Sequence, residues 1–404
     1  MTIRALLFFS FSLCFGYKAT AQENLFNVKY KTTITVGAER VSDYLYKLKG
    51  KKVGIVANQT SRVGYVHIVD TLLSLGVEVV KVFSPEHGFR GKASAGELVS
   101  NSKDIKTGLP IVSLYGKNKK PTKAQIADLD IIIFDIQDVG ARFYTYISTL
   151  HYVMEASAEN NKKVLILDRP NPNGFYIDGP ILDPKFSSFV GMHPIPVVHG
   201  LTVGELGKMI NGEKWLKNGV QCDLEVIKSK NYSHSDFYEL PVAPSPNLPN
   251  MASIYLYPSI CFFEGTSVSV GRGTDLPFQV IGSPFVAKTT YSFVPQPNGG
   301  SKYPKHENDT CNGYDLSVFG LMYIRNTNEL YLHWIIGMNQ KTTGSDFITR
   351  PGFFDLLAGT DEFRKQLVAG DKPEAIRESW LPGLKEYQKM RVKYLLYDDF
   401  EVKK

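Results

Sequence analysis

The sequence predicts an α/β fold with a doubly wound, mostly parallel sheet and a second, smaller α+β domain at the C-terminal end. From residue 50 to about residue 170, short β-branched apolar runs alternate with amphipathic stretches, a pattern typical of parallel strands joined by helices. Over residues 233–250 the composition becomes proline-rich, and beyond this stretch strands and helices are mixed. We therefore expect a catalytic domain over residues 22–240 and a smaller domain over residues 241–404.

The predicted strands are nearly uninterrupted apolar runs, which indicates burial on both faces of the sheet. They are residues 52–57, 78–83, 111–115, 130–135 and 164–168, followed by shorter candidates at 195–199 and 222–227. Apolar residues at helical spacing predict helices over residues 66–75 and 147–160, and Thr202 with Glu205 forms a capping-box pattern at the start of another helix. Residues 353–397 are predicted to be mostly helical, with breaks at Gly359, Pro373 and Pro382.

The N-terminus predicts export. Arg4 precedes an apolar stretch over residues 5–16, and Ala19 and Ala21 occupy the positions that a signal peptidase reads. A membrane span needs about 20 apolar residues, so this stretch is too short to be one, and no later segment resembles a span. We expect cleavage before Gln22, which removes two basic residues and lowers the net charge from +6 to +4. The expected product is an exported, periplasmic protein.

Composition and missing motifs exclude several classes of protein. The modest positive charge is spread along the chain, and we interpret the lysine-rich run 117–120 as a solvated surface, so no nucleic-acid partner is expected. No G-x-G-x-x-G follows the first strand, and 271–273 is not a P-loop, so no cofactor is expected. The mature cysteines lack metal-ligand spacing, so no metal site is expected, and either a disulfide or free thiols are compatible with their positions. They are Cys222, Cys261 and Cys311.

Polar side chains follow the predicted strands, and sheets of this kind bind ligands beyond the carboxyl ends of their strands. The candidates on these loops, taken in chain order, are Asn58, Glu86, His87, Asp135, Asp138, Arg142, Tyr144, Asp168, Arg169 and His199. Glu264 and Arg272 flank a further loop rich in glycine, serine and threonine. With neither a G-x-S-x-G elbow nor an H-E-x-x-H motif, this inventory of carboxylates, tyrosines, arginines and histidines suits a glycosidase.

Each candidate also has a structural interpretation. Glu86 lies between Pro85 and Gly88, where it could act as a general acid, cap a helix or pair with Arg90. Asp135 and Asp138 could orient sugar hydroxyls, or they could simply be acidic residues at a helix N-terminus. A histidine such as His199 is often a satisfied core residue.

Eight ordered motifs connect these residues to a known family. They are SPEHGFRG (84–91), AGE (95–97), SLYGK with KKPT (113–122), FDIQDVGARFYTYISTL (134–150), DRPNPNG (168–174), HGLTVGEL (199–206), APSPNLPN (243–250) and FEGTSVSVGRGTDLPFQVIGSP (263–284), and the stretch that they mark extends to KYLLY (393–397). In these motifs the chain resembles the bacterial exo-acting β-N-acetylmuramidases, glycoside hydrolases formerly classed as a domain of unknown function. The resemblance spans nearly the whole mature chain.

The resemblance implies hydrolysis of a terminal, non-reducing N-acetylmuramic acid from peptidoglycan fragments, in a cleft between a Rossmann-like domain and the smaller domain. Glu86 is then expected to be the general acid, tuned by His87, with Asp135, Asp138 or Glu264 in the second carboxylate role. Asn58 and His199 are expected to contact substrate together with the residues that suit its lactyl carboxylate and sugar hydroxyls. These last are Arg142, Tyr144, Arg169 and Arg272.

The sequence leaves alternatives open. The second carboxylate serves as a nucleophile, as a base, or as a group that orients the substrate's own acetamide. A non-catalytic periplasmic muropeptide-binding protein is the second hypothesis for the whole chain, and an esterase or amidase of the sugar's substituents is the third. Muropeptides or disaccharides are the expected ligands in each case.

Overall fold

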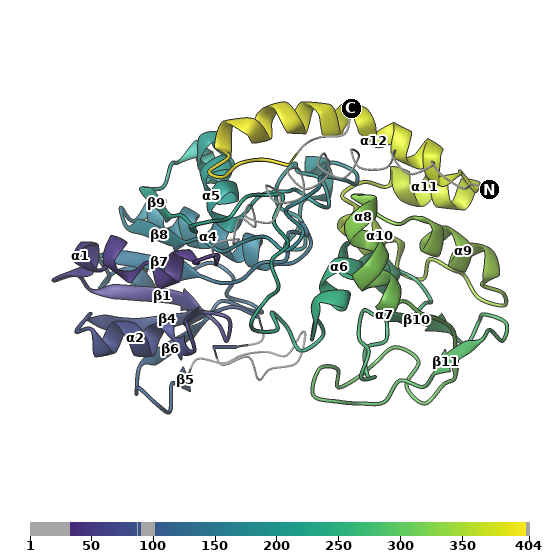
Figure 1. Ribbon diagram of the computed structural model, residues 1–404, viewed down its shortest axis with the longest axis horizontal. Helices are drawn as coiled ribbons and strands as arrows, with labels where there is room; N and C mark the ends of the chain where they lie inside the picture. Colours follow the sequence, from purple (N-terminus) through teal and green to yellow (C-terminus); the bar gives the residue numbers. More distant parts are fainter. Residues whose placement is uncertain (1–32, 87, 90–101, 401–404) are drawn as a thin grey trace, which may run out of the picture. The chain divides into compact units, whose positions relative to one another are not determined.

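A sheet of seven strands forms the centre of the N-terminal part of the chain (Figure 1). The computed structural model describes residues 33–86, 88–89 and 102–400. The strands lie in the order β5-β6-β4-β1-β7-β8-β9, and each neighbouring pair is parallel except β5 with β6. In chain order they are β1 (Val53–Ala57), β4 (Val79–Ser84), β5 (Ser102–Lys103), β6 (Pro110–Ser113), β7 (Ile131–Asp135), β8 (Lys163–Leu167) and β9 (Leu224–Ile227). The chain builds outward from β1 in both directions, which confirms the predicted doubly wound, mostly parallel sheet.

Both faces of the sheet are buried. Ile132 and Phe134 of β7 belong to one apolar cluster, and Ile131 and Ile133 belong to another, because successive residues of a strand point to opposite faces. The first cluster continues into helices α4 (Tyr146–Glu159) and α5 (Val203–Gly212), and the second continues into α1 (Leu45–Leu48) and α2 (Ile68–Ser74). This double burial explains why the strand sequences are almost uninterrupted apolar runs.

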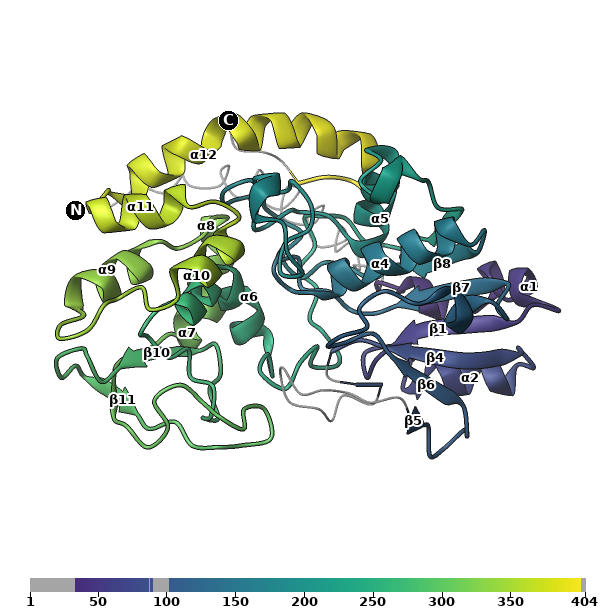
Figure 2. The same ribbon diagram turned by 180° about the vertical axis from the view of Figure 1, so that it is seen from behind.

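The C-terminal part contains a small antiparallel sheet and most of the remaining helices (Figure 2). Its strands, in the order β10-β12-β11, are β10 (Val280–Ser283), β11 (Tyr291–Phe293) and β12 (Cys311–Asp315). The helices are α6 (Met251–Ile260), α7 (Ser317–Phe319), α8 (Arg325–Thr327), α9 (His333–Lys341), α10 (Pro351–Ala358), α11 (Glu362–Ala369) and α12 (Pro373–Arg391). The predicted smaller α+β part is therefore present.

Helix α12 bonds to both parts of the fold, and in Figure 1 it is the long yellow helix. Near its start, Arg377 donates from Nη2 to the carbonyl of Leu330, at 2.7 Å. Near its end, the Tyr387 hydroxyl donates to the carbonyl of His199, also at 2.7 Å. Thr35–Lys404 form one compact unit, and the division at residue 240 stays a prediction.

Most predicted elements are confirmed, with small shifts at their ends. Thr202 and Glu205 form the predicted capping box at the start of α5, where the backbone N–H of Thr202 donates to the Glu205 carboxylate at 2.8 Å. The strand predicted at 195–199 is wrong, because this segment makes only isolated bridges, at Val198, to two loops. Pro382 lies inside α12 instead of ending it. Its ring is exposed, and Trp380 and Leu384 pack into the core on either side of it, so tertiary packing keeps the helix intact.

Two further features concern the described residues. Cys222, Cys261 and Cys311 are buried free thiols. No helix in the described ranges is long and apolar enough to cross a membrane.

Candidate active site

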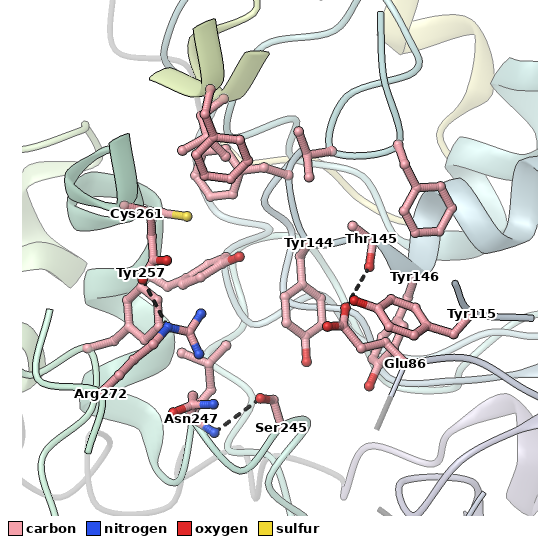
Figure 3. A pocket seen from close by; sticks show the side chains of 18 of the residues that line it. Glu86, Tyr115, Tyr144, Thr145, Tyr146, Ser245, Asn247, Tyr257, Cys261 and Arg272 are labelled. Atoms are coloured by element: carbon pink, nitrogen blue, oxygen red, sulfur yellow. Dashed lines mark hydrogen bonds and ion pairs between the residues drawn. The ribbon is translucent and has the colours of Figure 1, made fainter. Parts of the chain in front are cut away.

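A pocket of about 460 Å³ lies where the loops after β4, β6 and β7 meet the C-terminal part (Figure 3). This volume is within the range of small-molecule sites, roughly 300–1,000 Å³. The polar and ionisable residues that line it are Glu86, Tyr115, Lys119, Tyr144, Thr145, Tyr146, Ser245, Asn247, Tyr257, Cys261, Glu264 and Arg272. The pocket therefore combines residues from the carboxyl edge of the sheet with residues more than a hundred positions later in the chain.

Glu86 forms one side of the pocket. It lies on the turn that follows β4, where the backbone N–H of Gly88 donates to the carbonyl of Pro85 and Gly88 has a positive φ of 77°. Its carboxylate accepts a hydrogen bond from the Thr145 hydroxyl at 3.3 Å, and Tyr115, Tyr144 and Tyr146 surround it (Figure 3).

Two of these tyrosines are neutral hydrogen-bonding groups around the carboxylate. Burial raises the pKa of Tyr115 and of Tyr146, and the charge of Glu86 raises both further. Their phenols therefore remain protonated at neutral pH. Tyr146 donates its hydroxyl to the carbonyl of Pro244, at 3.1 Å, which fixes the ring between Glu86 and the 243–250 loop.

Glu264 and Arg272 form an ion pair on the side of the pocket opposite Glu86, where Figure 3 labels Arg272. Arg272 Nε lies 2.9 Å from Glu264 Oε1, and the guanidinium stacks on the ring of Phe278 with its carbon 4.8 Å from the ring centroid. Each of the two charged side chains is about one quarter exposed to solvent. Burial favours the neutral acid, but Arg272 and Lys305 outweigh it and lower the pKa of Glu264. Glu264 is therefore an ionised carboxylate at neutral pH.

The backbone around Glu264 is held by a partly buried lysine. Lys305 donates from Nζ to the carbonyls of Phe263 and Val268, both at 3.0 Å, and to that of Thr266. These carbonyls lie in and after the short helix Cys261–Gly265, which carries Glu264. The lysine thus fixes the loop between the two members of the ion pair.

Asp135 and Arg169 form a buried ion pair away from the pocket lining. Arg169 donates from Nε to Asp135 Oδ1 at 2.6 Å and from Nη2 to Oδ2 at 3.0 Å. Asp135 is completely buried and Arg169 is 4% exposed. Burial of Asp135 raises its pKa, although Arg169 opposes this. The pair joins the ends of β7 and β8, and a direct role of either residue in substrate binding or catalysis stays a prediction.

Asp138 and His199 are buried near each other, and neither lines the pocket. Asp138 Oδ2 accepts from the backbone N–H of Gly140 at 2.7 Å and lies 4.0 Å from His199 Nε2. Burial raises the pKa of Asp138 to about 7 and lowers that of His199 to about 3. His199 is therefore a neutral core residue, whose Nδ1 accepts from the backbone N–H of Leu201.

Arg142 and Asn58 also have structural contacts. Arg142 is fully buried and donates to the carbonyls of Pro180, Ile195, Leu357 and Ala358 at 2.6–3.0 Å. Asn58 Oδ1 accepts from the backbone N–H of Thr60 at 2.9 Å and from its hydroxyl at 2.6 Å. Neither residue lines the pocket. Their contacts with substrate stay a prediction that the pocket does not support. His87 lies outside the described residues.

The structure thus brings four predicted residues into one pocket and adds others that the sequence analysis did not single out. The four are Glu86, Tyr144, Glu264 and Arg272. The added residues include Tyr115, Lys119 and Asn247. Their signal was present, because SLYGK, KKPT and APSPNLPN were already recognised as motifs. In the described ranges, no group of three or more His, Cys, Asp or Glu side chains is arranged to hold a metal ion.

Comparisons with known proteins give consistent similarities. The models for the N-terminal and C-terminal parts of the exo-β-N-acetylmuramidase NamZ match residues 53–252 and 255–397. The peptidoglycan β-N-acetylmuramidase NamZ of Bacillus subtilis strain 168 is 39% identical over 396 residues, which covers 88% of this chain and 89% of that protein.

Two crystal structures of DUF1343-family proteins from Bacteroides fragilis NCTC 9343 have a similar fold. One is 47% identical with a TM-score of 0.84, covering 91% of this chain and 100% of its own. The other is 30% identical with a TM-score of 0.77, covering 90% and 99%.

We expect Asp135→Asn to lower the free energy of unfolding by about 3–5 kcal/mol, because it leaves the buried Arg169 charge without its partner. Chemical denaturation measures this loss. Asp128→Asn is the matched control, since Asp128 pairs with Lys81 at 2.7 Å and its side chain is 47% exposed. The control should lose at most about 1 kcal/mol. An equal loss of unfolding free energy in the two variants would show that burial of the Asp135–Arg169 pair does not increase its contribution to stability.

Asp138→Asn should change how stability depends on pH. The pKa of Asp138 is about 7 in the folded chain and 3.8 ordinarily, so the folded state holds more protons between these values, and wild-type stability falls as pH rises through that range. Asparagine has no proton to lose. Relative to wild type, the variant should therefore gain about 2 kcal/mol between pH 5 and pH 8. Urea denaturation at both pH values tests this, and a constant difference would contradict the shift.

Proposed function

This chain belongs to the exo-β-N-acetylmuramidase family, and from that premise we propose that it hydrolyses the terminal, non-reducing N-acetylmuramic acid from peptidoglycan fragments. The fragments are muropeptides or disaccharides that arise in cell-wall turnover or recycling. The observation that carries the proposal is the presence of Glu86 and Glu264 in one pocket, lined by tyrosines and two cations. Two carboxyl groups on either side of a scissile bond are what glycoside hydrolysis requires.

Glu86 is the general acid in this proposal. It lies at the carboxyl edge of the sheet among protonated tyrosines, with Thr145 directing one carboxylate oxygen. From this position it delivers its proton to the glycosidic oxygen as the bond to the anomeric carbon breaks. The remainder of the substrate then leaves as a neutral alcohol, so its departure needs no further catalyst.

Glu264 takes the second carboxylate role. Of the three candidates, Asp135 is paired with Arg169 and Asp138 is buried without lining the pocket, whereas Glu264 lines it. Arg272 and Lys305 keep Glu264 ionised. An ionised carboxylate stabilises the positive charge that develops at the anomeric carbon, whether it attacks that carbon, activates water or orients the acetamide.

Glu86→Gln should lower kcat by about 10²- to 10⁴-fold on a disaccharide with N-acetylmuramic acid at its non-reducing end. The loss should be much smaller on an aryl β-N-acetylmuramide, because a phenol with a low pKa leaves without protonation. Glu264→Gln should slow both substrates by similar factors. Chromophore release and product chromatography measure the rates.

The matched control is Glu78→Gln, an exposed acid just before β4, which should match wild type. The melting temperature of Glu86→Gln should stay close to that of wild type, whereas a large drop would assign Glu86 a structural role. Undiminished turnover of the disaccharide by Glu86→Gln would remove it as the acid. No hydrolysis of either muramide by wild type would overturn the proposed function itself.

We also propose that the chain is exported to the periplasm, where peptidoglycan fragments are found. The support is the signal-peptide pattern of residues 1–21. Mass spectrometry of the protein from a periplasmic fraction should give an N-terminus at Gln22, and Ala21→Asp should block this processing because the cleavage site needs a small residue. Recovery of the uncleaved chain from the cytoplasm alone would contradict export.

A further inference from the structure

Lys119 has a charge that the described residues around it do not balance. It lines the pocket with Glu86, Glu264 and Arg272, which are the other charged residues of the lining within the described parts of the chain. Arg272 is paired with Glu264 at 2.9 Å. Within the described parts of the chain, Lys119 has no carboxylate in salt-bridge distance, and its Nζ lies 4.3 Å from the centroid of the Phe189 ring. The ammonium is therefore held at the pocket by an aromatic face rather than by an anion.

The neighbouring lysines show that this environment is specific to Lys119. Lys120 forms ion pairs at 2.7 Å with both Glu155 and Glu159 of α4. Lys117 is exposed and does not line the pocket. The interpretation of the run 117–120 as a solvated surface is therefore wrong for Lys119, because Lys119 lines the pocket. Lys117 is exposed, and Lys120 is paired with α4.

Phe189, the aromatic residue that Lys119 contacts, is itself attached to α4. The Phe189 carbonyl accepts a hydrogen bond from the Ser148 hydroxyl of α4 at 2.8 Å. Its ring stacks on that of Tyr152, with 6.2 Å between centroids and an interplanar angle of 12°. Phe189 also lines the pocket. The contacts of Phe189 with α4 thus place the lysine head group at the pocket before any ligand arrives, which reduces the entropy lost on binding.

Charge balance then indicates what the pocket selects. The Glu264–Arg272 pair is neutral as a unit, because the two charges lie against each other at 2.9 Å. Lys119 is the cation of the pocket lining that has no described carboxylate at salt-bridge distance, so it suits a ligand with one negative charge. N-acetylmuramic acid differs from N-acetylglucosamine by an O-lactyl group, and that group has one carboxylate wherever no peptide is attached to it.

We propose that Lys119 is the specificity-determining residue of this site: its ammonium binds the lactyl carboxylate and makes the enzyme prefer N-acetylmuramic acid to N-acetylglucosamine. The inference rests on the proposed function. It assigns Arg272 to orienting Glu264, and it assigns recognition of the substrate's charge to Lys119, which pairs with no carboxylate among the described residues.

The test compares Lys119→Met with wild type on three aryl β-glycosides, namely the muramide, its lactyl methyl ester and the glucosaminide. Loss of a charge-assisted hydrogen bond should lower kcat/KM for the muramide by about 10- to 100-fold. The variant should equal wild type on the ester and on the glucosaminide, because neither has the carboxylate. Lys119→Arg should retain the preference for the muramide. Lys117→Met, which removes an exposed lysine from the same run, should equal wild type on all three.

Calorimetric titration with free N-acetylmuramic acid and N-acetylglucosamine gives a readout that does not need turnover. Wild type should bind N-acetylmuramic acid more tightly than N-acetylglucosamine, and Lys119→Met should bind the two sugars equally. Equal losses on the muramide and its ester, or an unchanged preference in the variant, would overturn the role of Lys119 and point to Arg272. If wild type cleaves neither muramide yet shows the binding preference, the proposed hydrolysis fails while the charge recognition stands.

Discussion

The buried guanidinium of Arg142 fixes the two sides of the pocket relative to each other. It donates to carbonyls of Pro180 and Ile195 in the N-terminal part and of Leu357 and Ala358 at the end of α10. Residues 143–146, which follow it directly, line one side of the pocket, and Leu357 lines the other. Burial lowers the pKa of Arg142 only to about 9, so it is still a cation that these carbonyls must satisfy. These four hydrogen bonds of Arg142 thus connect the two sides of the pocket directly.

The polar residues at the carboxyl edge of the sheet divide into two functions. Asp135 with Arg169 and Asp138 with His199 lie in the buried layer, where they connect strand ends and satisfy loop backbone. Glu86 lies one layer further out, on a turn that continues past the sheet. The hydrogen bonds of this buried layer support the outer layer, and such support is what holds catalytic groups in productive geometry.

Sequence reasoning predicted the doubly wound sheet because double burial leaves a direct trace, the uninterrupted apolar strands. It also named Glu86, Tyr144, Glu264 and Arg272 as candidates, and these four line the pocket. It could not separate them from Asp135, Arg142 or Asn58, because polar residues at strand ends look alike until tertiary contacts decide which are buried. Lys119 was missed for the opposite reason: a run of lysines is usually solvated, and only Phe189, seventy residues later, places one of them in the pocket. The strand predicted at 195–199 was wrong, since an apolar run does not reveal whether a neighbouring strand is available to pair with it.

The charges in the pocket explain why a neutral ion pair and an unbalanced lysine occur together. A glycosidase needs one carboxylate that stays ionised, and Arg272 and Lys305 provide for this at Glu264. Because Glu264 already neutralises the charge of Arg272, this arginine attracts an anionic sugar only weakly. Selection by charge then requires a separate cation, held where no protein carboxylate neutralises it. An aromatic ring is suited to this, because it attracts an ammonium without cancelling its charge, and Phe189 places Lys119 in that way. Catalysis and substrate choice are thereby assigned to different cations of the same pocket, and a change in one need not disturb the other.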